Sequence, residues 1–117
     1  NARVPIGTYN QGIETDDLVL TSGQVGMIHL RFSWWWRNDT QAAQTLKNME
    51  AILNSVDLGK DSIAKLTVFV KNLDDFQSVN KAFENFFNGI DYPARSTVEV
   101  SELPMGALIE IECIAIK

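Results

Sequence analysis

Apolar and polar positions alternate in several short stretches of the chain, and this alternation predicts β-strands. Two β-prone runs, residues 8–14 and 18–25, flank an acidic turn at residues 15–17, which together predict a hairpin. Further strands with a period of two are predicted at residues 63–71, 95–101 and 108–116. The last two are joined by a turn-forming stretch, SELPMGA, so they could pair antiparallel.

Two other segments place apolar residues at helical spacing. The first runs from residue 38 or 39 to residue 56, with Asp39 available to cap its start and Gly59 placed to end it. The second, residues 74–88, begins with two aspartates, which favour the positive end of a helix. Its apolar stripe is more typical of a core than of a binding site and comprises Phe76, Val79, Phe83 and Phe86.

This order of elements predicts one α+β domain over residues 1–117, with a mixed sheet and two helices on one of its faces. The opposite face would be too apolar for water and too charged for a core. Its expected side chains are Phe69, Ile114 and Ile116 beside Lys65, Thr67, Arg95, Glu99, Glu110 and Glu112. Such a face favours association between subunits that close over it.

Residues 28–40, IHLRFSWWWRNDT, follow neither pattern. Alternation would put Trp34 and Trp36 on one side and Trp35 on the other, so at least one large ring needs cover. A partner subunit could supply that cover, and an error in this part of the sequence is the alternative.

Composition narrows the classes of function. The 117 residues are 45% hydrophobic and 21% charged, as in ordinary globular domains, and the net charge of -5 disfavours a nucleic-acid partner. The one cysteine, Cys113, lies in an apolar alternation and is expected in the core, which fits a reducing, cytoplasmic compartment. No stretch approaches the roughly 20 apolar residues of a membrane span, so no membrane partner is expected.

Several common catalytic arrangements do not fit this sequence. A serine triad needs a histidine, but the only one, His29, lies in the irregular segment at residues 28–40, and no nucleophile motif such as GxSxG occurs. A zinc site needs three or four suitable ligands, which one histidine and one cysteine cannot provide. Neither GxGxxG nor GxxxxGK occurs, so the phosphate loops of nucleotide cofactors have no counterpart. We therefore expect neither a metal nor a cofactor.

Polar residues near the predicted strand ends and in the second helix remain as candidates: Tyr9, Ser22, Asn80, Arg95 and Glu110. An arginine can hold a carboxylate through two parallel hydrogen bonds, and a glutamate can orient or deprotonate water. An ion pair of Arg95 with Glu99, Glu110 or Glu112 would explain the arginine equally well. Composition and spacing leave these two interpretations balanced.

Five segments in family order resemble the Rid family of reactive imine and enamine deaminases, also called the YjgF family. They cover nearly the whole chain and are GTYNQGI (7–13), LVLTSGQ (18–24), QTLKNMEAIL (44–53), KLTVFVKNLDDFQSVNKAFENFF (65–87) and YPARSTVEVSELPMGALIEIECIAI (92–116). The resemblance implies a chorismate-mutase-like α+β fold and a homotrimer with ligand clefts between subunits. It also implies cofactor-free hydrolysis of 2-imino acids, such as 2-iminobutanoate and 2-iminopropanoate, to 2-oxo acids and ammonia.

The resemblance also implies roles for individual residues. Arg95 would bind the substrate carboxylate and Glu110 would position the attacking water. The matching pocket positions are Tyr9, Ser22, Gly23 and Asn80. Two other functions stay open: a regulator that binds small carboxylates without turnover, and an RNA-cleaving or translation-inhibiting role.

Three departures from the family pattern affect these expectations. Thr8 stands where proline is commoner before the tyrosine, and residues 27–40 lack the usual Pro and Thr-Gly turn. Thr97 replaces a cysteine often found two residues after the arginine, so thiol chemistry is not expected here. The cleft rim, and with it the substrate preference, is where this chain is expected to differ most.

Overall fold

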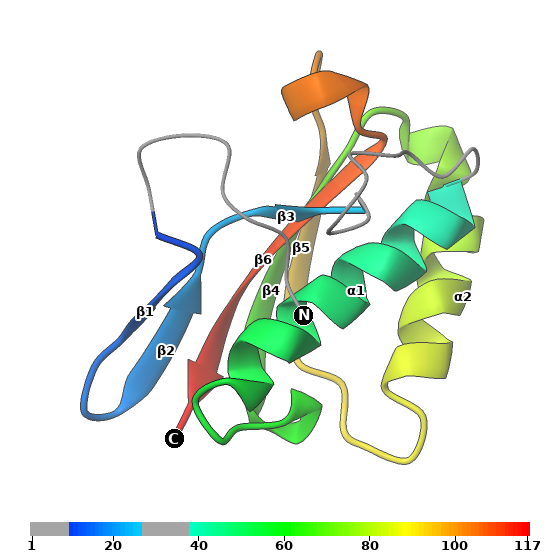
Figure 1. Ribbon diagram of the computed structural model, residues 1–117. Coiled ribbons are helices and arrows are strands. Elements are labelled where there is room, and N and C mark those ends of the chain that lie inside the picture. The colour runs from blue at the N-terminus through cyan, green and yellow to red at the C-terminus, as the bar shows by residue number, and fades with distance from the viewer. Residues whose placement is uncertain (1–9, 27–37) are drawn as a thin grey trace.

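In the part of the chain that the structure describes, six strands form one mixed sheet, and two helices lie on one of its faces (Figure 1). The computed structural model describes residues 10–26 and 38–117. The strands run in the order β1-β2-β6-β4-β5, and β3 pairs with β6. The strands are β1 (Gly12–Glu14), β2 (Leu18–Thr21), β3 (Gln24–Val25), β4 (Ile63–Val70), β5 (Ala94–Glu99) and β6 (Ile109–Ile116), and the helices are α1 (Asn38–Asn54) and α2 (Phe76–Phe86). The predicted α+β arrangement, with both helices on one face, is confirmed.

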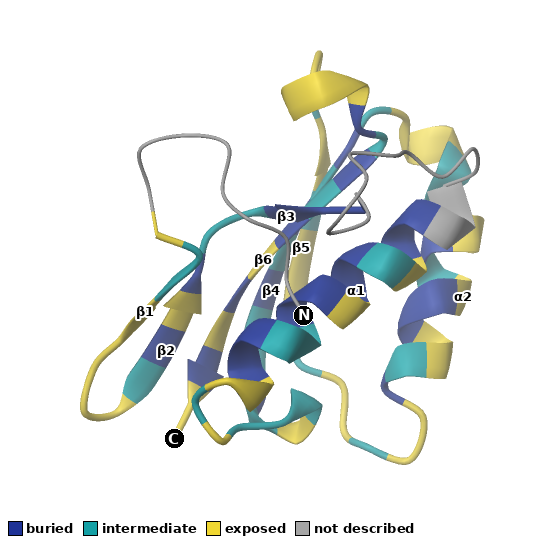
Figure 2. Ribbon diagram, viewed as in Figure 1, coloured by how far each residue is buried: buried dark blue, intermediate teal, exposed yellow. Residues whose placement is uncertain are grey.

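The core lies between the sheet and the helices, where alternate strand residues meet the apolar stripes of α1 and α2 (Figure 2). Every second residue of β6 is buried, from Ile109 through Ile111 and Cys113 to Ala115. Leu46, Met49 and Leu53 of α1 and Val79 and Phe83 of α2 pack against them. Cys113 is therefore a core residue, as its alternation predicted.

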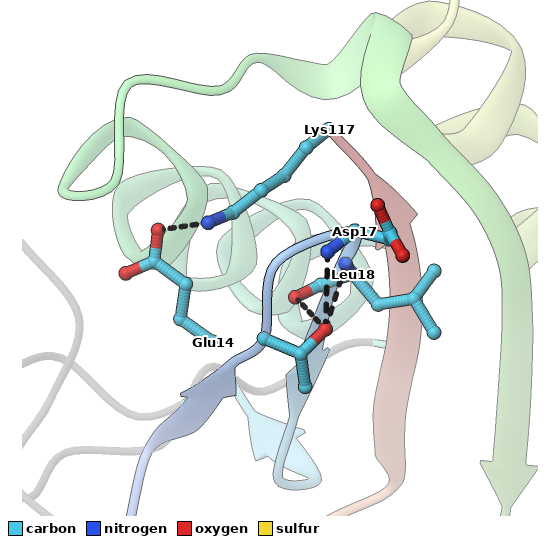
Figure 3. Close-up of polar contacts among 5 residues, drawn as sticks. Glu14, Asp17, Leu18 and Lys117 are labelled. Atoms are coloured by element: carbon cyan, nitrogen blue, oxygen red, sulfur yellow. Dashed lines mark hydrogen bonds and ion pairs between the residues drawn. The ribbon is translucent and has the colours of Figure 1, made fainter.

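The N-terminal hairpin is confirmed for β1 and β2, which pair antiparallel. Thr15 closes the turn: its amide donates to the Leu18 carbonyl at 2.8 Å, and its hydroxyl oxygen accepts from the Leu18 amide at 2.9 Å. Lys117, at the end of the last strand, forms an ion pair with Glu14 across the hairpin (Figure 3). The run predicted at residues 18–25 is interrupted at Ser22, because β2 and β3 pair with different parts of β6.

The predicted antiparallel pairing of the last two strands is wrong. β4 lies between them, pairing in parallel with β5 and antiparallel with β6. A parallel pair needs a long crossover, and α2 supplies it between β4 and β5. Strand β5 is consequently an edge strand of the sheet.

The first helix was predicted to run to residue 56 with Gly59 placed to end it, but it ends at Asn54. Asp57 takes the left-handed conformation with φ of 61°, the place where glycine is usual. The Leu58 amide donates to the Leu53 carbonyl at 2.9 Å and the Asp57 amide to the Asn54 carbonyl at 3.2 Å. These two bonds satisfy carbonyls that the helix end would otherwise leave unpaired.

The second helix is shorter than the predicted 74–88. Residues Leu73–Asp75 form a 3-10 turn, and the Asn72 side chain accepts from the Asp74 amide at 2.9 Å, which caps this turn. Helix α2 then runs from Phe76 to Phe86. Phe83 and Val79 of its apolar stripe are buried, which confirms their core role, while Phe76 is half-buried.

Some predictions fall on residues that the structure does not describe. Tyr9, Thr8 and the tryptophans at 34–36 lie outside the described residues, as does the side chain of Asp39, the expected helix cap.

Candidate functional site

Arg95 lines a pocket of about 440 Å³ at the edge of the sheet, between β5 and α2. It is the second residue of β5 and follows Pro93, which also lines the pocket. The remaining walls are mostly aromatic and apolar, and the full lining is Leu66, Asn80, Phe83, Glu84, Phe87, Tyr92, Pro93 and Arg95. The structure therefore brings together two of the predicted site residues, Arg95 and Asn80.

The Arg95 guanidinium lies over two phenylalanine rings of α2. Its central carbon is 4.8 Å from the ring centre of Phe83 and 5.3 Å from that of Phe76. Within residues 10–26 and 38–117, its N–H groups have no hydrogen-bond or ion-pair partner. Partial burial lowers the pKa of Arg95 from its ordinary value, because desolvation disfavours the charged form.

The register of the sheet corrects where Arg95 was expected. Arg95 pairs with Leu66 and Glu99 with Val70, so both share the helix-covered face and not the open face. Glu99 accepts a hydrogen bond from the Leu73 amide at 2.9 Å, on the same side. The open face of β5 instead presents Ser96 and Val98.

Glu110 lies in a second cluster, beside Gly23. Glu110 pairs with Val25 of β3, so the Glu110 side chain lies next to the segment that precedes β3. A Cβ atom added at Gly23 would lie 2.3 Å from Oε2 of Glu110, so a side chain there would displace the carboxylate. Ser22 precedes Gly23, and its hydroxyl donates to the Asn10 carbonyl. The structure therefore brings Gly23 and Glu110 into contact.

The environment of Glu110 favours its neutral form. Burial of this half-buried side chain raises the pKa of Glu110, and repulsion from Glu112 on the same face raises it further. A carboxylate with a raised pKa is a better proton acceptor than an ordinary glutamate once it is ionised.

The two clusters do not meet within one chain. Two residues of β4 show this. Arg95 of β5 pairs with Leu66 and shares its face of the sheet, whereas Glu110 of β6 pairs with Phe69 and shares the face of Phe69. Leu66 and Phe69 are three residues apart in β4 and so point to opposite faces of the sheet. Arg95 and Glu110 consequently lie on opposite faces, which the sequence had not predicted.

Six pocket residues were not predicted from the sequence as site residues: Leu66, Phe83, Glu84, Phe87, Tyr92 and Pro93. A signal for Phe83 was present, since Phe76, Asn80 and Phe83 follow the i, i+4, i+7 spacing of one helix face. Tyr92 and Pro93 directly precede the strand that carries Arg95. The stripe was assigned to the core alone because periodicity does not separate a buried ring from one that also lines a pocket.

Other groups of the described chain offer little chemistry. Across residues 10–26 and 38–117, no three His, Cys, Asp or Glu side chains are grouped so that they could hold a metal ion. Burial raises the pKa of the Cys113 thiol to about 11, which keeps it protonated at neutral pH. None of the helices in this part of the chain is both long and apolar enough to span a membrane.

Comparisons with known proteins give one consistent family. A family model described as endoribonuclease L-PSP matches residues 1–117. The chain is 44% identical over 117 residues to RutC family protein UK114 of Drosophila melanogaster, covering 99% of this chain and 84% of that protein. It is 41% identical over 119 residues to the 2-iminobutanoate/2-iminopropanoate deaminase of Escherichia coli K12, covering 100% of this chain and 93% of that protein.

A solved structure agrees. E. coli TdcF with bound serine matches with a TM-score of 0.97 and 36% identity, over 99% of this chain and 93% of that chain. The full-length family match and these relatives accord with the motifs around Arg95 and Glu110, so the chain belongs to the Rid family, also called the YjgF family.

Proposed function

We propose that this protein hydrolyses 2-imino acids, such as 2-iminobutanoate and 2-iminopropanoate, to 2-oxo acids and ammonia. The observation that carries the proposal is the Arg95 guanidinium, which has no polar partner among the described residues and lines an aromatic pocket. A planar fork with free N–H groups can bind a carboxylate through two hydrogen bonds. Every 2-imino acid has such a carboxylate next to its reactive carbon.

The relatives support this substrate class. The E. coli protein that is 41% identical to this chain is named for the hydrolysis of two 2-imino acids. The structure of TdcF holds serine, whose α-carboxylate is the group that 2-imino acids share with amino acids.

The reaction needs few protein groups. A protonated imine is already electrophilic, so a held carboxylate and an oriented water supply most of what catalysis requires. Water adds to the carbon of the protonated imine and gives one proton to the carboxylate of Glu110, which leaves a carbinolamine. Glu110 then returns that proton to the nitrogen, the C–N bond breaks to release ammonia, and the hydroxyl loses its proton to form the carbonyl of the 2-oxo acid. The pKa of Glu110, raised by burial, suits a group that accepts a proton and returns it.

We further propose that the working site is formed between neighbouring copies in a homotrimer. Arg95 and Glu110 lie on opposite faces of one sheet, so a second copy is needed to bring a glutamate to an arginine. The open face supports such an association, because Leu20, Val98, Ile114 and Ile116 are all exposed there, by 38% to 55%. Tyr9, Ser22, Gly23 and Asn80 would complete the cleft.

A coupled assay tests the activity. The protein is added to a threonine dehydratase reaction, and formation of 2-oxobutanoate is compared with the uncatalysed rate. We expect acceleration by the wild-type protein and a loss of about 100-fold or more in kcat/KM for Arg95→Ala, the size expected for a lost bidentate carboxylate contact in a partly dry site. Arg95→Lys should restore little, because an ammonium does not reproduce the fork.

Lys81→Ala is the matched control, since it removes an exposed cation of α2 that does not line the pocket. Full activity of Arg95→Ala, or no acceleration by the wild-type protein, would overturn the proposal. If calorimetry showed 2-oxobutanoate binding without acceleration, the protein would instead be a carboxylate-binding regulator.

RNA cleavage is a second candidate, favoured by the description of the family model as an endoribonuclease. The net charge of -5 opposes it, because a phosphate backbone is bound chiefly through positive charge. We expect no cleavage of a single-stranded RNA by the purified protein. Cleavage that is lost in Arg95→Ala but kept in Lys81→Ala would establish this function.

A further inference from the structure

We propose that Phe76 and Phe83 are positioning residues, whose rings hold the Arg95 guanidinium in the orientation that receives a carboxylate. The inference rests on the proposed function and adds to it two residues from a helix that resemblance had linked to the site only through Asn80. The face of α2 that is turned toward Arg95 would thus be part of the carboxylate-binding site.

The distances fit a cation held over aromatic faces. The guanidinium carbon is 4.8 Å from the ring centre of Phe83 and 5.3 Å from that of Phe76, both inside the roughly 6 Å limit of a cation–π contact. The two rings are seven residues apart on α2, so they project from the same side of the helix two turns apart. Asn80 lies between them in the same helix and lines the same pocket.

Aromatic faces can orient an arginine without using its hydrogen-bond donors. An ion pair with a glutamate would occupy the same N–H groups that a substrate carboxylate needs. Contact with ring faces engages the flat side of the guanidinium and leaves its edges free. This agrees with the finding that, in the described part of the chain, no carboxylate is paired with Arg95.

The rings of Phe76 and Phe83, which we call the aromatic platform, are themselves held in place. Phe83 is only 4% exposed and belongs to the main core, together with the pocket residue Phe87. Phe76 is the first residue of α2 and follows the capped turn at Leu73–Asp75, which sets where the helix begins. Without such a support, a long arginine side chain at an exposed edge would sample many rotamers and lose them on binding.

A double-mutant cycle tests the proposal. Phe83→Leu and Phe76→Leu keep apolar bulk but remove the ring, and each is made in the wild-type and the Arg95→Ala backgrounds. We expect KM in the coupled assay, and Kd for 2-oxobutanoate by calorimetry, to rise about three- to tenfold, as for a partly desolvated cation–π contact, with little change in kcat. In the Arg95→Ala background neither replacement should weaken binding further, because the group that the rings position is gone.

Phe86→Leu is the control, because this phenylalanine of α2 carries Lys60 at 4.9 Å over its ring and does not line the pocket. It should lose stability in thermal unfolding with KM unchanged. Added guanidinium ion provides a second readout. It should restore part of the activity of Arg95→Ala, and less of it in Arg95→Ala with Phe83→Leu, which a purely structural role would not produce.

The inference would be overturned if Phe76→Leu and Phe83→Leu weakened binding equally in the presence and absence of Arg95. It would also be overturned if Phe86→Leu raised KM as much as Phe83→Leu. If Phe83→Leu does not fold, the half-buried Phe76 carries the cycle alone. Calorimetry separates this inference from the proposed activity. A wild-type protein that binds 2-oxobutanoate through the platform without turnover would support the inference and refute the deaminase, whereas no binding at all would refute both.

Discussion

Partial burial acts on Arg95 and Glu110 in opposite directions. Desolvation lowers the pKa of Arg95 and raises the pKa of Glu110, because it disfavours the charged form of each. Arginine stays protonated even so, since its ordinary pKa lies far above neutrality. For Glu110 the shift has a functional consequence, because it moves the titration of the proposed base toward the pH at which the enzyme would work.

Activity should therefore fall on acidification at a higher pH than an ordinary glutamate would set. Protonated Glu110 cannot accept a proton from water, so kcat/KM is expected to decline as the pH falls through its raised pKa. Glu112→Gln should move this inflection to lower pH, because it removes the second cause of the shift. A pH profile of kcat/KM for the wild type, Glu112→Gln and Glu110→Gln is the measurement.

The same shift has a sign for stability. Since the pKa of Glu110 is higher in the folded than in the unfolded state, ionisation opposes folding, and stability is lost as the pH rises through the window between the two values. Glu110→Gln should remove that loss and be the more stable protein above the window. In the pH profile of kcat/KM described above, an inflection that persists unchanged in Glu110→Gln would show that a group other than Glu110 titrates.

At the scale of elements, β5 and α1 were predicted as the right type of element, but the partner of the strand and the end of the helix were not. Strand β5 was predicted correctly as a strand, yet its partner is β4 and not β6, because the α2 crossover brings it back in parallel. Helix α1 was also predicted correctly, yet it ends through Asp57 and not through Gly59. Gly59 itself has φ of -121°, which any residue adopts.

Replacing Asp57 should therefore stabilise the protein. Asp57→Gly removes the Cβ that makes a left-handed residue unfavourable, and we expect a gain of about 0.5 to 1 kcal/mol after the greater entropy of glycine in the unfolded chain is counted. Urea unfolding at 25 °C measures it. Asp57→Ala is the control, since it removes the carboxylate but keeps the Cβ. An equal gain in both variants would attribute the effect to charge at the helix end.

At the scale of the whole molecule, both helices cover the same face of the sheet, and the described residues leave the other face open (Figure 2). The open face carries Ile116, 55% exposed, and Ile114, 38% exposed, beside the charged residues Glu110 and Glu112. A patch of this kind is typical of surfaces that bind another protein. In the proposed homotrimer this open face would become buried. The Arg95 cluster of one chain would meet the Glu110 cluster of a neighbour, and its own Glu110 cluster would meet an Arg95 cluster.

A charge placed on this face should break the assembly. Ile114→Glu would bury an unpaired carboxylate in the proposed interface, so we expect light scattering after size exclusion to give the mass of one chain instead of three. Deaminase activity should fall with it, because Arg95 and Glu110 would no longer share a cleft. Asn85→Glu, an equivalent exposed change on α2, should leave both unaffected. A monomeric variant with full activity would refute the composite site.

Local patterns in the sequence were sufficient to predict the helices and most of the strands. A period of two or of 3.6 residues depends only on near neighbours, which is why the buried faces of β6 and α2 could be predicted. The motifs around Arg95, Gly23 and Glu110 were sufficient to indicate the family. The turn at Thr15 was readable for the same reason, since its hydrogen bonds span three residues.

Only the tertiary structure decided which of these residues meet. Strand order and register depend on contacts far apart in the chain, so the sequence did not reveal that Arg95 pairs with Leu66 and lies over Phe83, on the face opposite Glu110. The sequence also did not reveal that the Arg95 guanidinium, which has no polar partner among the described residues, lies over aromatic rings. The choice between an ion pair and a ring contact is set by the face on which a strand residue falls.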